Sequence, residues 1–439
     1  MIPATRSDLR LPASAAEIRA LQTRRKQHAV RQAMRAPFFR KKLEHVDLAR
    51  IDDPEEWLSI PILDKDMLRA MSDAQFYEDF CIKPEGDDPT VEFWRSGGST
   101  GRPLFYPRSR RDLEAALEGF ARVLLCAGAD RSARTHCSFP LGIHPAGQMM
   151  ARAAQHLGMS VVTAGAGTTT PSHLQLELIT RFGPQVWMGM SSYGLHLANL
   201  ADHHDIDLAR SAVELIICSA EPLSSTKRQK LECAWNARVR DSFGMTEAGM
   251  MGSEDGRADG FRIWSDLFFI EVIDPETRLP VREGEVGGLV VTALATNNVT
   301  PFLRWYSGDL VTCRHDVPGE GPFSIFPVLK HAHRTTGFFK IRGVNISHGE
   351  FEEFIFGNPC VNDFKCEAVA VGAQDLLRVC VELKRGTEPG GAVRLLCEQI
   401  KRTFEISPEI VLLDPGALAR EFESSIKAAR MVDRRNEKA

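Results

Sequence analysis

The middle of the chain alternates short apolar segments with helical segments, and this alternation restricts the fold more than any other feature. The apolar segments are 160–164, 185–190 and 213–218. Segments this short and apolar are typical of strands buried on both faces of a parallel sheet. The helical segments 172–182 and 225–237 are expected to be the crossover helices. The sequence therefore predicts an α/β fold with mostly parallel sheets.

The flanking regions follow other patterns. Residues 14–46 have apolar positions near a 3.6-residue period among basic residues, which predicts a helix. The β-rich segments 268–273 and 288–294 flank a turn-rich stretch and predict an antiparallel hairpin. Residues 338–346 read as a strand, and Ser347-His348-Gly349-Glu350 is a capping box that opens a helix.

These patterns predict a large core and a small C-terminal domain. The core, 1–334, comprises the helical lead-in, α/β sheets over 90–266 and a β-rich part over 267–333. Residues 335–439 alternate strand and helix in a small α+β domain. A chain of 439 residues exceeds what one core usually holds, which agrees with two domains.

The composition indicates which kinds of binding partner are expected and in which cellular compartment the protein lies. A net charge of −4 gives no general attraction to nucleic acid or to an anionic membrane. The basic helix at 14–46 is interpreted as a solvated face rather than a membrane or nucleic-acid element. Neither a secretory signal nor a run of about 18 apolar residues is seen. Ten cysteines without CxxC spacing favour reduced thiols in the cytoplasm.

The first motif with chemistry is a loop rich in glycine and hydroxyl groups. Its residues are Ser96, Gly97, Gly98, Ser99, Thr100, Gly101 and Arg102. The glycines allow backbone N–H groups to approach an anion, and the hydroxyls and guanidinium add donors and charge. The loop lacks the Lys-Ser/Thr ending of a P-loop. It is interpreted as a phosphate cradle, although such a loop by itself is more often a linker.

Two further motifs lie downstream. Phe243-Gly244-Met245-Thr246-Glu247 brings an aromatic ring, a hydroxyl and a carboxylate together, which suits a base, a phosphate and Mg²⁺. Arg304-Trp305-Tyr306-Ser307-Gly308-Asp309 places a carboxylate after a Ser-Gly turn, where it can accept bonds from a ribose diol. In isolation each would equally suit a strand end or an ordinary turn.

The order of the motifs, together with Ala220-Glu221-Pro222, the segment RTTGFFKIRGVN at 334–345 and Lys427, resembles the adenylate-forming superfamily. That superfamily contains acyl-CoA synthetases, peptide-synthetase adenylation domains and luciferases. Within it the chain is similar to the phenylacetate–CoA ligase branch. The similar segments are AMRAPFFRKKL near the N-terminus, SSYGLHLAN at 191–199, IDPETRLPVREGEVGGLVVTAL at 273–294 and KAARMVDRR at 427–435.

The resemblance implies ATP, Mg²⁺ and CoA as cofactors and assigns a role to each motif. Ser96–Arg102 would cradle the β- and γ-phosphates, Thr246 would contact the α-phosphate, and Glu247 would bind Mg²⁺. Lys427, reaching in from a mobile C-terminal domain, would offset charge as the carboxylate attacks, and is grouped with Thr246 and Glu247 as catalytic. The other residues implied at the nucleotide are Ala220, Glu221, Pro222, Phe243, Gly244, Met245, Asp309 and Arg342.

The acid would lie between the sheet and the helices. The candidates for its walls are Ser191, Ser192, Tyr193, Phe139 and His144, with Ala220 and Met245. Aromatic walls and the small Ala220 would suit a flat aryl or arylacetic acid.

The chain departs from the family pattern at several positions. Arg102 stands where a Lys is usual, Gly97 where a hydroxyl is usual, and Ile426 replaces the Gly before the C-terminal Lys. The hinge has Thr336 where an Asp is usual. The stretch SEDGRADGFRI has neither Cys nor His, so no structural zinc is expected.

Three functional interpretations follow. The first is an aryl-acid CoA ligase, and the second is an adenylate-forming enzyme whose acceptor is an amine, nitrite or a carrier-protein thiol. The third is a degenerate nucleotide-binding protein, against which the joint presence of Glu247, Asp309 and Lys427 argues. The expected partners are a small carboxylic acid and ATP, without nucleic acid or membrane, and relatives of this type often pair as homodimers.

Overall fold

The computed structural model describes residues 9–83, 88–96, 103–334, 338–342, 344–371, 374–423 and 430–435. The chain divides into two compact units. The first comprises Met1–Thr135, Leu141–Val161 and Arg240–Thr335, and the second comprises His136–Pro140, Val162–Val239 and Thr336–Ala439. The chain passes from one unit to the other within strands β3 (Arg134–Cys137), β4 (Ser160–Thr163) and β7 (Arg238–Met245).

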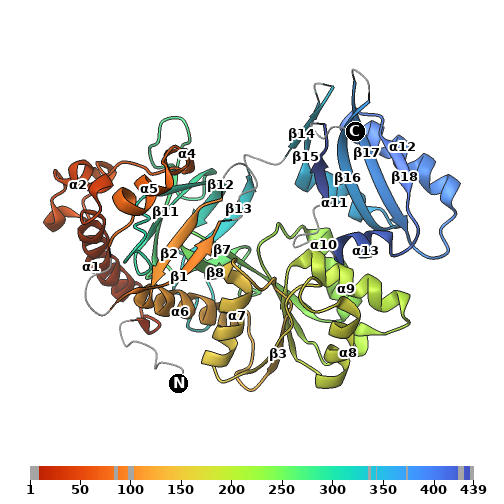
Figure 1. Ribbon diagram of the computed structural model, residues 1–439, viewed down its shortest axis with the longest axis horizontal. Coiled ribbons are helices and arrows are strands. Elements are labelled where there is room, and N and C mark those ends of the chain that lie inside the picture. Colours follow the sequence, from red (N-terminus) through yellow and green to blue (C-terminus); the bar gives the residue numbers. More distant parts are fainter. Residues whose placement is uncertain are drawn as a thin grey trace. The chain divides into compact units, whose positions relative to one another are not determined.

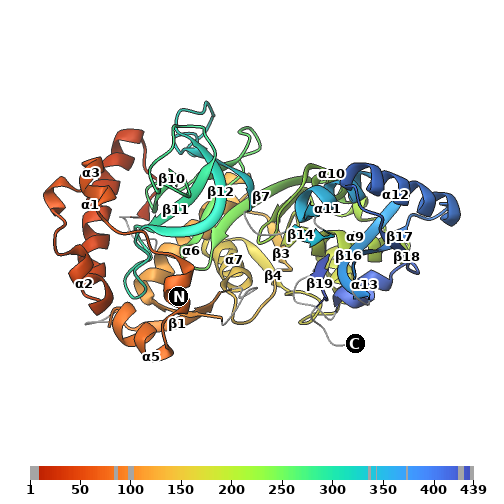
Figure 2. The ribbon, with the colours of Figure 1, turned by 90° about the horizontal axis from the view of Figure 1, so that it is seen from above.

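The first unit begins with the long helix α1, continues with several short helices and then has two longer ones. These elements are α1 (Ala15–Ala33), α2 (Pro37–Leu43), η2 (Leu48–Arg50), α3 (Pro54–Leu58), α4 (Lys65–Arg69), α5 (Asp73–Gln75), the π-helical η3 (Phe76–Phe80), α6 (Arg110–Cys126) and α7 (Pro145–His156). Helix α6 lies beside α7 and beside strand β8 (Figures 1 and 2).

The strands of the first unit pair in an antiparallel manner. Their order is β10-β11-β12-β13-β9-β8-β7, with β1 and β2 in a separate two-stranded sheet. Their bounds are β1 (Thr90–Arg95), β2 (Phe105–Ser109), β8 (Gly249–Ser253), β9 (Phe261–Ile263), β10 (Phe268–Ile273), β11 (Gly287–Ala293), β12 (Trp305–Arg314) and β13 (Val328–Arg334). The hairpin expected around residue 280 is confirmed by the pairing of β10 with β11.

A buried apolar cluster joins the N-terminal helices to this sheet. Phe39, Phe76 and Phe80 from the helices are at most 1% exposed, and they share the cluster with Phe302 and Trp305. Burying a side chain of this size contributes about 2–3 kcal/mol. The N-terminal helices therefore brace the β-rich part of the first unit.

The second unit contains the parallel pairing expected from the apolar segments. Strand β5 (Val186–Gly189) pairs in parallel with β6 (Leu215–Cys218). The surrounding helices are α8 (Ser172–Phe182), α9 (Ser191–His203), η4 (Leu208–Arg210) and α10 (Ser225–Trp235). The expected strands and crossover helices are thus confirmed within a residue or two, and the α/β class is confirmed.

The C-terminal part of the second unit is built on a four-stranded sheet of order β18-β17-β16-β19. Its elements are β14 (Phe338–Ile341), β15 (Val344–Ser347), α11 (His348–Gly357), β16 (Val361–Val371), β17 (Gln374–Leu383), α12 (Pro389–Phe404), β18 (Glu409–Leu412), α13 (Ala417–Glu423) and β19 (Met431–Asp433). Helix α12 lies beside β18 (Figure 2). It buries Ala392, Leu396 and Ile400, which are four residues apart and share one helical face.

Three local expectations are corrected. Residues 14–46 form two helices because Ala36 is extended and Pro37 opens the second helix. Residues 338–346 form two strands because Arg342, with φ +50°, turns the chain so that Ile341 pairs with Val344. Asp309 lies inside strand β12 rather than after a free turn.

Other sequence expectations concern the cap of α11, the cysteines, membrane helices and the domain division. The N-cap half of the predicted capping box is confirmed, because the Ser347 side chain accepts a bond from the Glu350 amide and caps α11. None of the ten cysteines, all of which lie in the described part of the chain, forms a disulfide bond. Among the described residues, no helix is both long and apolar enough to cross a membrane. The division into a core at 1–334 and a domain at 335–439 stays a prediction.

Candidate active site

The turn between β7 and β8 carries the motif of residues 243–247. Strand β7 ends at Met245 and β8 begins at Gly249, so Thr246 and Glu247 lie in the connection. A side chain at Gly244 would place its Cβ 2.6 Å from the Gly249 carbonyl oxygen and 2.9 Å from the Met250 Cα. Only glycine allows this close approach of the two strands. The turn therefore presents a hydroxyl and a carboxylate on a tightly constrained backbone.

Tyr106 holds the carboxylate of Glu247. Its hydroxyl donates to Glu247 Oε1 at 3.0 Å, and Glu247 is 8% exposed. Burial, followed by the negative charge of Glu247, raises the pKa of Tyr106, so the phenol stays a donor at neutral pH. The orientation of the Glu247 carboxylate is thus fixed from strand β2.

Arg108 holds the backbone of the same turn. Its Nη2 donates to the Thr246 carbonyl at 2.8 Å and to the Glu247 carbonyl at 2.6 Å, and its Nη1 donates to the Thr296 carbonyl at 2.8 Å. The guanidinium is fully buried and lies over the Trp94 ring at 4.8 Å. Burial lowers the pKa of Arg108, although the charges of Asp112 and Glu247 oppose this effect. Three carbonyl acceptors satisfy a charge that would be costly to bury alone.

The loop interpreted as a phosphate cradle begins at a fixed point. Ser96 accepts a bond from the Leu104 amide at 3.1 Å, and its own amide donates to the Leu104 carbonyl at 2.9 Å. These bonds fasten the chain on both sides of the loop. Gly97, Gly98, Ser99, Thr100, Gly101 and Arg102 lie outside the described residues.

Strand β12 carries the predicted ribose-binding carboxylate. Asp309 is 8% exposed, and its amide donates to Ser307 Oγ at 3.0 Å. Gly308, at φ +82°, provides the kink that a residue with a Cβ would resist. Arg304, at the start of this motif, is buried and donates to both oxygens of Glu271, at 2.9 and 3.1 Å. Its role is therefore structural.

Phe243 lies in the core beside this region. It is 7% exposed, and its ring centroid is 5.0 Å from that of His331 and 5.7 Å from that of Phe261.

Taken together, these contacts show that the first unit contains Ser96, Thr246 and Glu247 with the supporting residues Tyr106 and Arg108.

A second group of predicted residues converges in the second unit. Glu221 Oε2 accepts bonds from Ser191 Oγ at 2.9 Å and from the Ser192 amide at 3.1 Å, and Ser192 Oγ donates to Glu221 Oε1. The residue before it, Ala220, has φ +71°, an uncommon conformation for a side chain with a Cβ. Helix α9 has no side-chain cap from its own N-cap residue, Met190, so Glu221 supplies the negative group at its N-terminus.

The remaining predicted wall residues have different surroundings. The Tyr193 hydroxyl bonds with Ser172 Oγ at 2.8 Å and accepts from Gln175 Nε2 at 2.9 Å, which ties it into a buried polar network. Phe139 is 1% exposed in the second unit. His144 is the N-cap residue of α7 in the first unit.

Four further residues singled out in the sequence belong to the C-terminal part. Arg342 Nε donates to the Asp375 carbonyl at 2.9 Å. Lys427, Thr336 and Ile426 lie outside the described residues.

Sequence reasoning missed three residues that position the predicted ones: Tyr106, Arg108 and Lys227. Tyr106 and Arg108 are alternate residues of a strand that follows the Ser/Gly-rich loop, and this placement was a usable signal. Lys227 lies 3.8 Å from Glu221 Oε2 and its side chain is 3% exposed. No sequence signal distinguishes it from a solvated helical lysine.

The residues at the β7–β8 turn suit a magnesium nucleotide. Within the described part of the chain, no group of three or more His, Cys, Asp or Glu side chains is arranged to hold a metal ion. Mg²⁺ in nucleotide-dependent enzymes is commonly held by one or two carboxylates together with substrate phosphates. The single buried carboxylate of Glu247, fixed by Tyr106, fits that mode of binding.

Comparison with known proteins identifies the family. The sequence model of the AMP-binding enzyme family matches residues 9–296, and the chain belongs to that family. It is 28% identical to phenylacetate-coenzyme A ligase of Aromatoleum evansii, with 96% of each chain covered. It is 27% identical to phenylacetate-coenzyme A ligase of Escherichia coli strain K12, with 99% of each chain covered.

Solved structures share the fold. The chain matches a crystal structure of 2-hydroxyisobutyryl-CoA ligase, in the postadenylation state in complex with 2-HIB-AMP, with a TM-score of 0.81. The sequences are 22% identical, and the match covers 99% of this chain and 94% of the other. The family match and the relatives named as ligases confirm the resemblance to adenylate-forming enzymes and the prediction of a ligase.

Proposed function

We propose that this protein activates a carboxylic acid with ATP as an acyl-adenylate and then transfers the acyl group to the thiol of coenzyme A. We assign an aryl or arylacetic acid as the substrate class. Two relatives that match nearly the whole chain are named phenylacetate-coenzyme A ligases, which supports this class. The observation that carries the proposal is the β7–β8 turn, where Tyr106 and Arg108 fix the Glu247 carboxylate and its backbone.

The proposed reaction has two steps. In the first, a carboxylate oxygen of the acid attacks the α-phosphorus of ATP, the bond to the bridging oxygen breaks, and pyrophosphate leaves. In the second, the CoA thiolate attacks the acyl carbon, the bond to the AMP oxygen breaks, and AMP leaves. Both steps need placement and charge stabilisation more than they need a covalent enzyme intermediate.

The nucleotide roles are proposed as follows. The Thr246 hydroxyl contacts the α-phosphate, Asp309 accepts bonds from the ribose hydroxyls, and the Ser96–Arg102 loop donates to the outer phosphates. Mg²⁺ bound with Glu247 would neutralise phosphate charge. Lys427 would offset the negative charge of the attacking carboxylate and the α-phosphate as they approach.

The residues proposed to contact the acid and the adenine base include the group around Glu221 in the second unit. Ser191 and Ser192 are proposed to shape the wall that faces the acid, Glu221 is proposed to lie at the adenine base, and Ala220 leaves room for a flat ring. The Tyr193 hydroxyl is already bonded to Ser172 and Gln175, so the ring rather than the hydroxyl is assigned to the wall. Phe139, His144 and Met245 remain candidate wall residues.

The setting of the protein is also a proposal. Ten cysteines without a disulfide bond agree with a reducing, cytoplasmic environment. We propose a homodimer without nucleic-acid or membrane partners, and light scattering after gel filtration measures the oligomeric state directly.

The test is ATP–pyrophosphate exchange over a panel of aryl, arylacetic and aliphatic acids, followed by addition of CoA, an amine or nitrite with the best acid. Exchange with an arylacetic or aryl acid, followed by thioester formation with CoA, is the expected result. Exchange without a thioester would replace CoA by another acceptor. The absence of exchange with every acid would overturn the assignment.

A further inference from the structure

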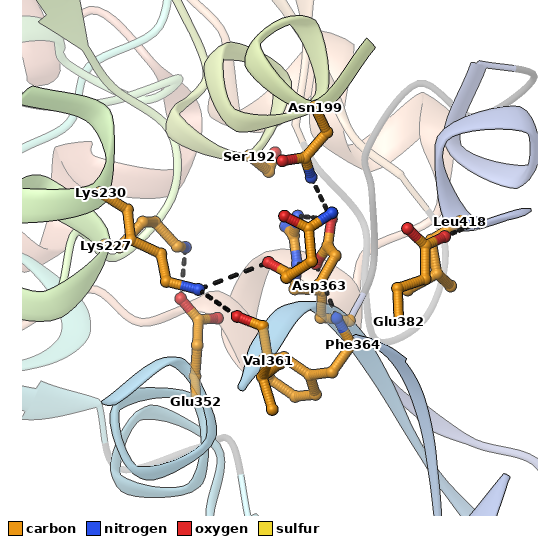
Figure 3. Close-up of polar contacts among 12 residues, drawn as sticks. Ser192, Asn199, Lys227, Lys230, Glu352, Val361, Asp363, Phe364, Glu382 and Leu418 are labelled. Atoms are coloured by element: carbon orange, nitrogen blue, oxygen red, sulfur yellow. Dashed lines mark hydrogen bonds and ion pairs between the residues drawn. The ribbon is translucent and has the colours of Figure 1, made fainter. Parts of the chain in front are cut away.

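Helix α10 presents two lysines, one turn apart, that reach different partners (Figure 3). Lys227 forms an ion pair with Glu352 of α11, donates to the Pro222 carbonyl at 3.3 Å, and lies 3.8 Å from Glu221 Oε2. Lys230 instead donates to the carbonyls of Val361 and Asn362, at 3.1 and 3.4 Å. Both lysines contact the C-terminal part of the second unit, but only Lys227 also contacts Glu221.

Lys227 is buried between two carboxylates from distant segments. Its side chain is 3% exposed, while those of Glu221 and Glu352 are 13% and 18% exposed. An ammonium in such surroundings is tolerated only when it is paired, and removing its partners leaves a costly buried charge. The position of Lys227 therefore depends on both carboxylates at once.

Glu221 in turn is bonded to the first turn of helix α9. Its two oxygens take the hydroxyls of Ser191 and Ser192 and the amide of Ser192, all in the first turn of α9. A negative group at this end of a helix is stabilised by the unpaired amides and the helix dipole. A continuous polar chain thus runs from α11 through Lys227 and Glu221 to the start of α9.

We propose that Lys227 is a positioning residue that fixes the Glu221 carboxylate against Ser191 and Ser192 and makes this wall depend on helix α11. The effect on catalysis rests on the proposed function, in which these residues face the acid and the base. With Glu352 in place, Lys227 is shared between two carboxylates. Without Glu352, its charge acts on Glu221 alone.

Three variants and one control test this role. Lys227→Met removes the cation, Lys227→Arg restores it, and Glu352→Gln cuts the connection to α11 while Lys227 stays in place. Lys230→Met is the matched control because it removes the next lysine of the same helix, which contacts the same C-terminal part but not Glu221. The measurements are KM and kcat for the acid in pyrophosphate exchange, and hydrogen–deuterium exchange of the Ser192 amide.

Lys227→Met is expected to raise the KM for the acid about tenfold with a smaller change in kcat, corresponding to one charge-assisted contact. Glu352→Gln should shift KM less, and Lys227→Arg should recover most of the loss. The Ser192 amide should exchange faster in Lys227→Met than in Lys230→Met, because its acceptor Glu221 is less firmly held.

Equal KM values and equal Ser192 exchange in Lys227→Met and Lys230→Met would overturn the proposal. If the wild-type protein catalyses no exchange with any acid, the proposed function fails by itself. The Ser192 amide then still decides the positioning role, since its protection needs no substrate.

Discussion

Glu247 and the backbone around it depend on two side chains that belong to none of the recognised motifs. Tyr106 controls the direction of the carboxylate, whereas Arg108 controls the peptide groups on either side of it. The motif supplies the reactive group types, and strand β2 supplies their geometry. A substitution of Tyr106 or Arg108 in β2 should therefore affect activity in the same way as a substitution in the motif.

Tyr106→Phe tests this dependence with a single atom. It removes the donor to Glu247 Oε1 and leaves a buried carboxylate oxygen without that bond, a cost of about 1–3 kcal/mol. We expect pyrophosphate exchange to fall about tenfold or more and its dependence on Mg²⁺ concentration to shift. The matched control is Tyr77→Phe, which removes an exposed hydroxyl that donates to the Phe105 carbonyl. An unchanged Mg²⁺ profile in Tyr106→Phe would show that this bond does not position the carboxylate.

At the scale of elements, the β7–β8 hairpin and helix α10 act as scaffolds for different groups. The hairpin sets the turn of Thr246 and Glu247 through a close approach of two strands. Helix α10 contacts α11 and the start of β16 through its lysines. Each scaffold gives a prediction that involves no reacting atom.

Gly244→Ala tests the hairpin. The added Cβ would meet the Gly249 carbonyl oxygen at 2.6 Å, and neither backbone can yield without moving the turn. We expect a loss of about 2 kcal/mol in the free energy of unfolding, together with reduced exchange activity. Gly357→Ala, where a Cβ meets no atom within 4 Å, is the control and should be close to neutral. Chemical denaturation measures both, and equal stability of the two variants would contradict the steric argument.

Lys230 predicts a pH dependence for α10. Burial lowers its pKa from the ordinary 10.5 to about 8, with Lys384 and Arg430 adding to this effect and Asp363 opposing it. Between these values the unfolded chain binds the proton more strongly, so folding releases it. The cost of burying the charge is therefore full below about pH 8 and is relieved as the pH rises toward 10.5.

The measurement is the difference in the free energy of unfolding between wild type and Lys230→Met. This difference should shift in favour of the wild type as the pH is raised from about 8 to about 10, and it should be flat below about 8. Groups common to both proteins cancel in the difference. A difference that does not vary with pH would mean that Lys230 keeps its ordinary pKa in the folded state.

At the scale of the whole molecule, a two-step ligase must use one set of residues for adenylation and then admit a thiol. In the proposed function, Lys427 contributes to the chemical step of adenylation and not to the binding of ATP. It would act on the α-phosphate only as charge builds up during the attack. Its removal should therefore affect the rate far more than the affinity.

Lys427→Ala is expected to lower pyrophosphate exchange about 100-fold or more while ATP binding, measured by calorimetry, is kept. Lys401→Ala, which removes an exposed lysine from the last turn of α12, is the control and should match the wild type. Wild-type exchange in Lys427→Ala would exclude this lysine from the mechanism.

Sequence patterns were most informative where a local property decides the structure. Strands β5 and β6 follow from short apolar segments, and α8 and α10 follow from the helical segments 172–182 and 225–237. Ser347 caps α11 as its spacing predicts. The failures were local too: Pro37 divides one expected helix, and the positive φ of Arg342 divides one expected strand.

The sequence by itself determined the α/β class, the family and the types of reactive group, because apolar periodicity and motif order are properties of neighbouring residues. Only the tertiary structure decided which partners hold those groups. Tyr106 meets Glu247, and Lys227 lies between Glu221 and Glu352, across large separations along the chain. Such contacts depend on how distant segments pack and on which buried charges must be paired, and no local pattern contains that information.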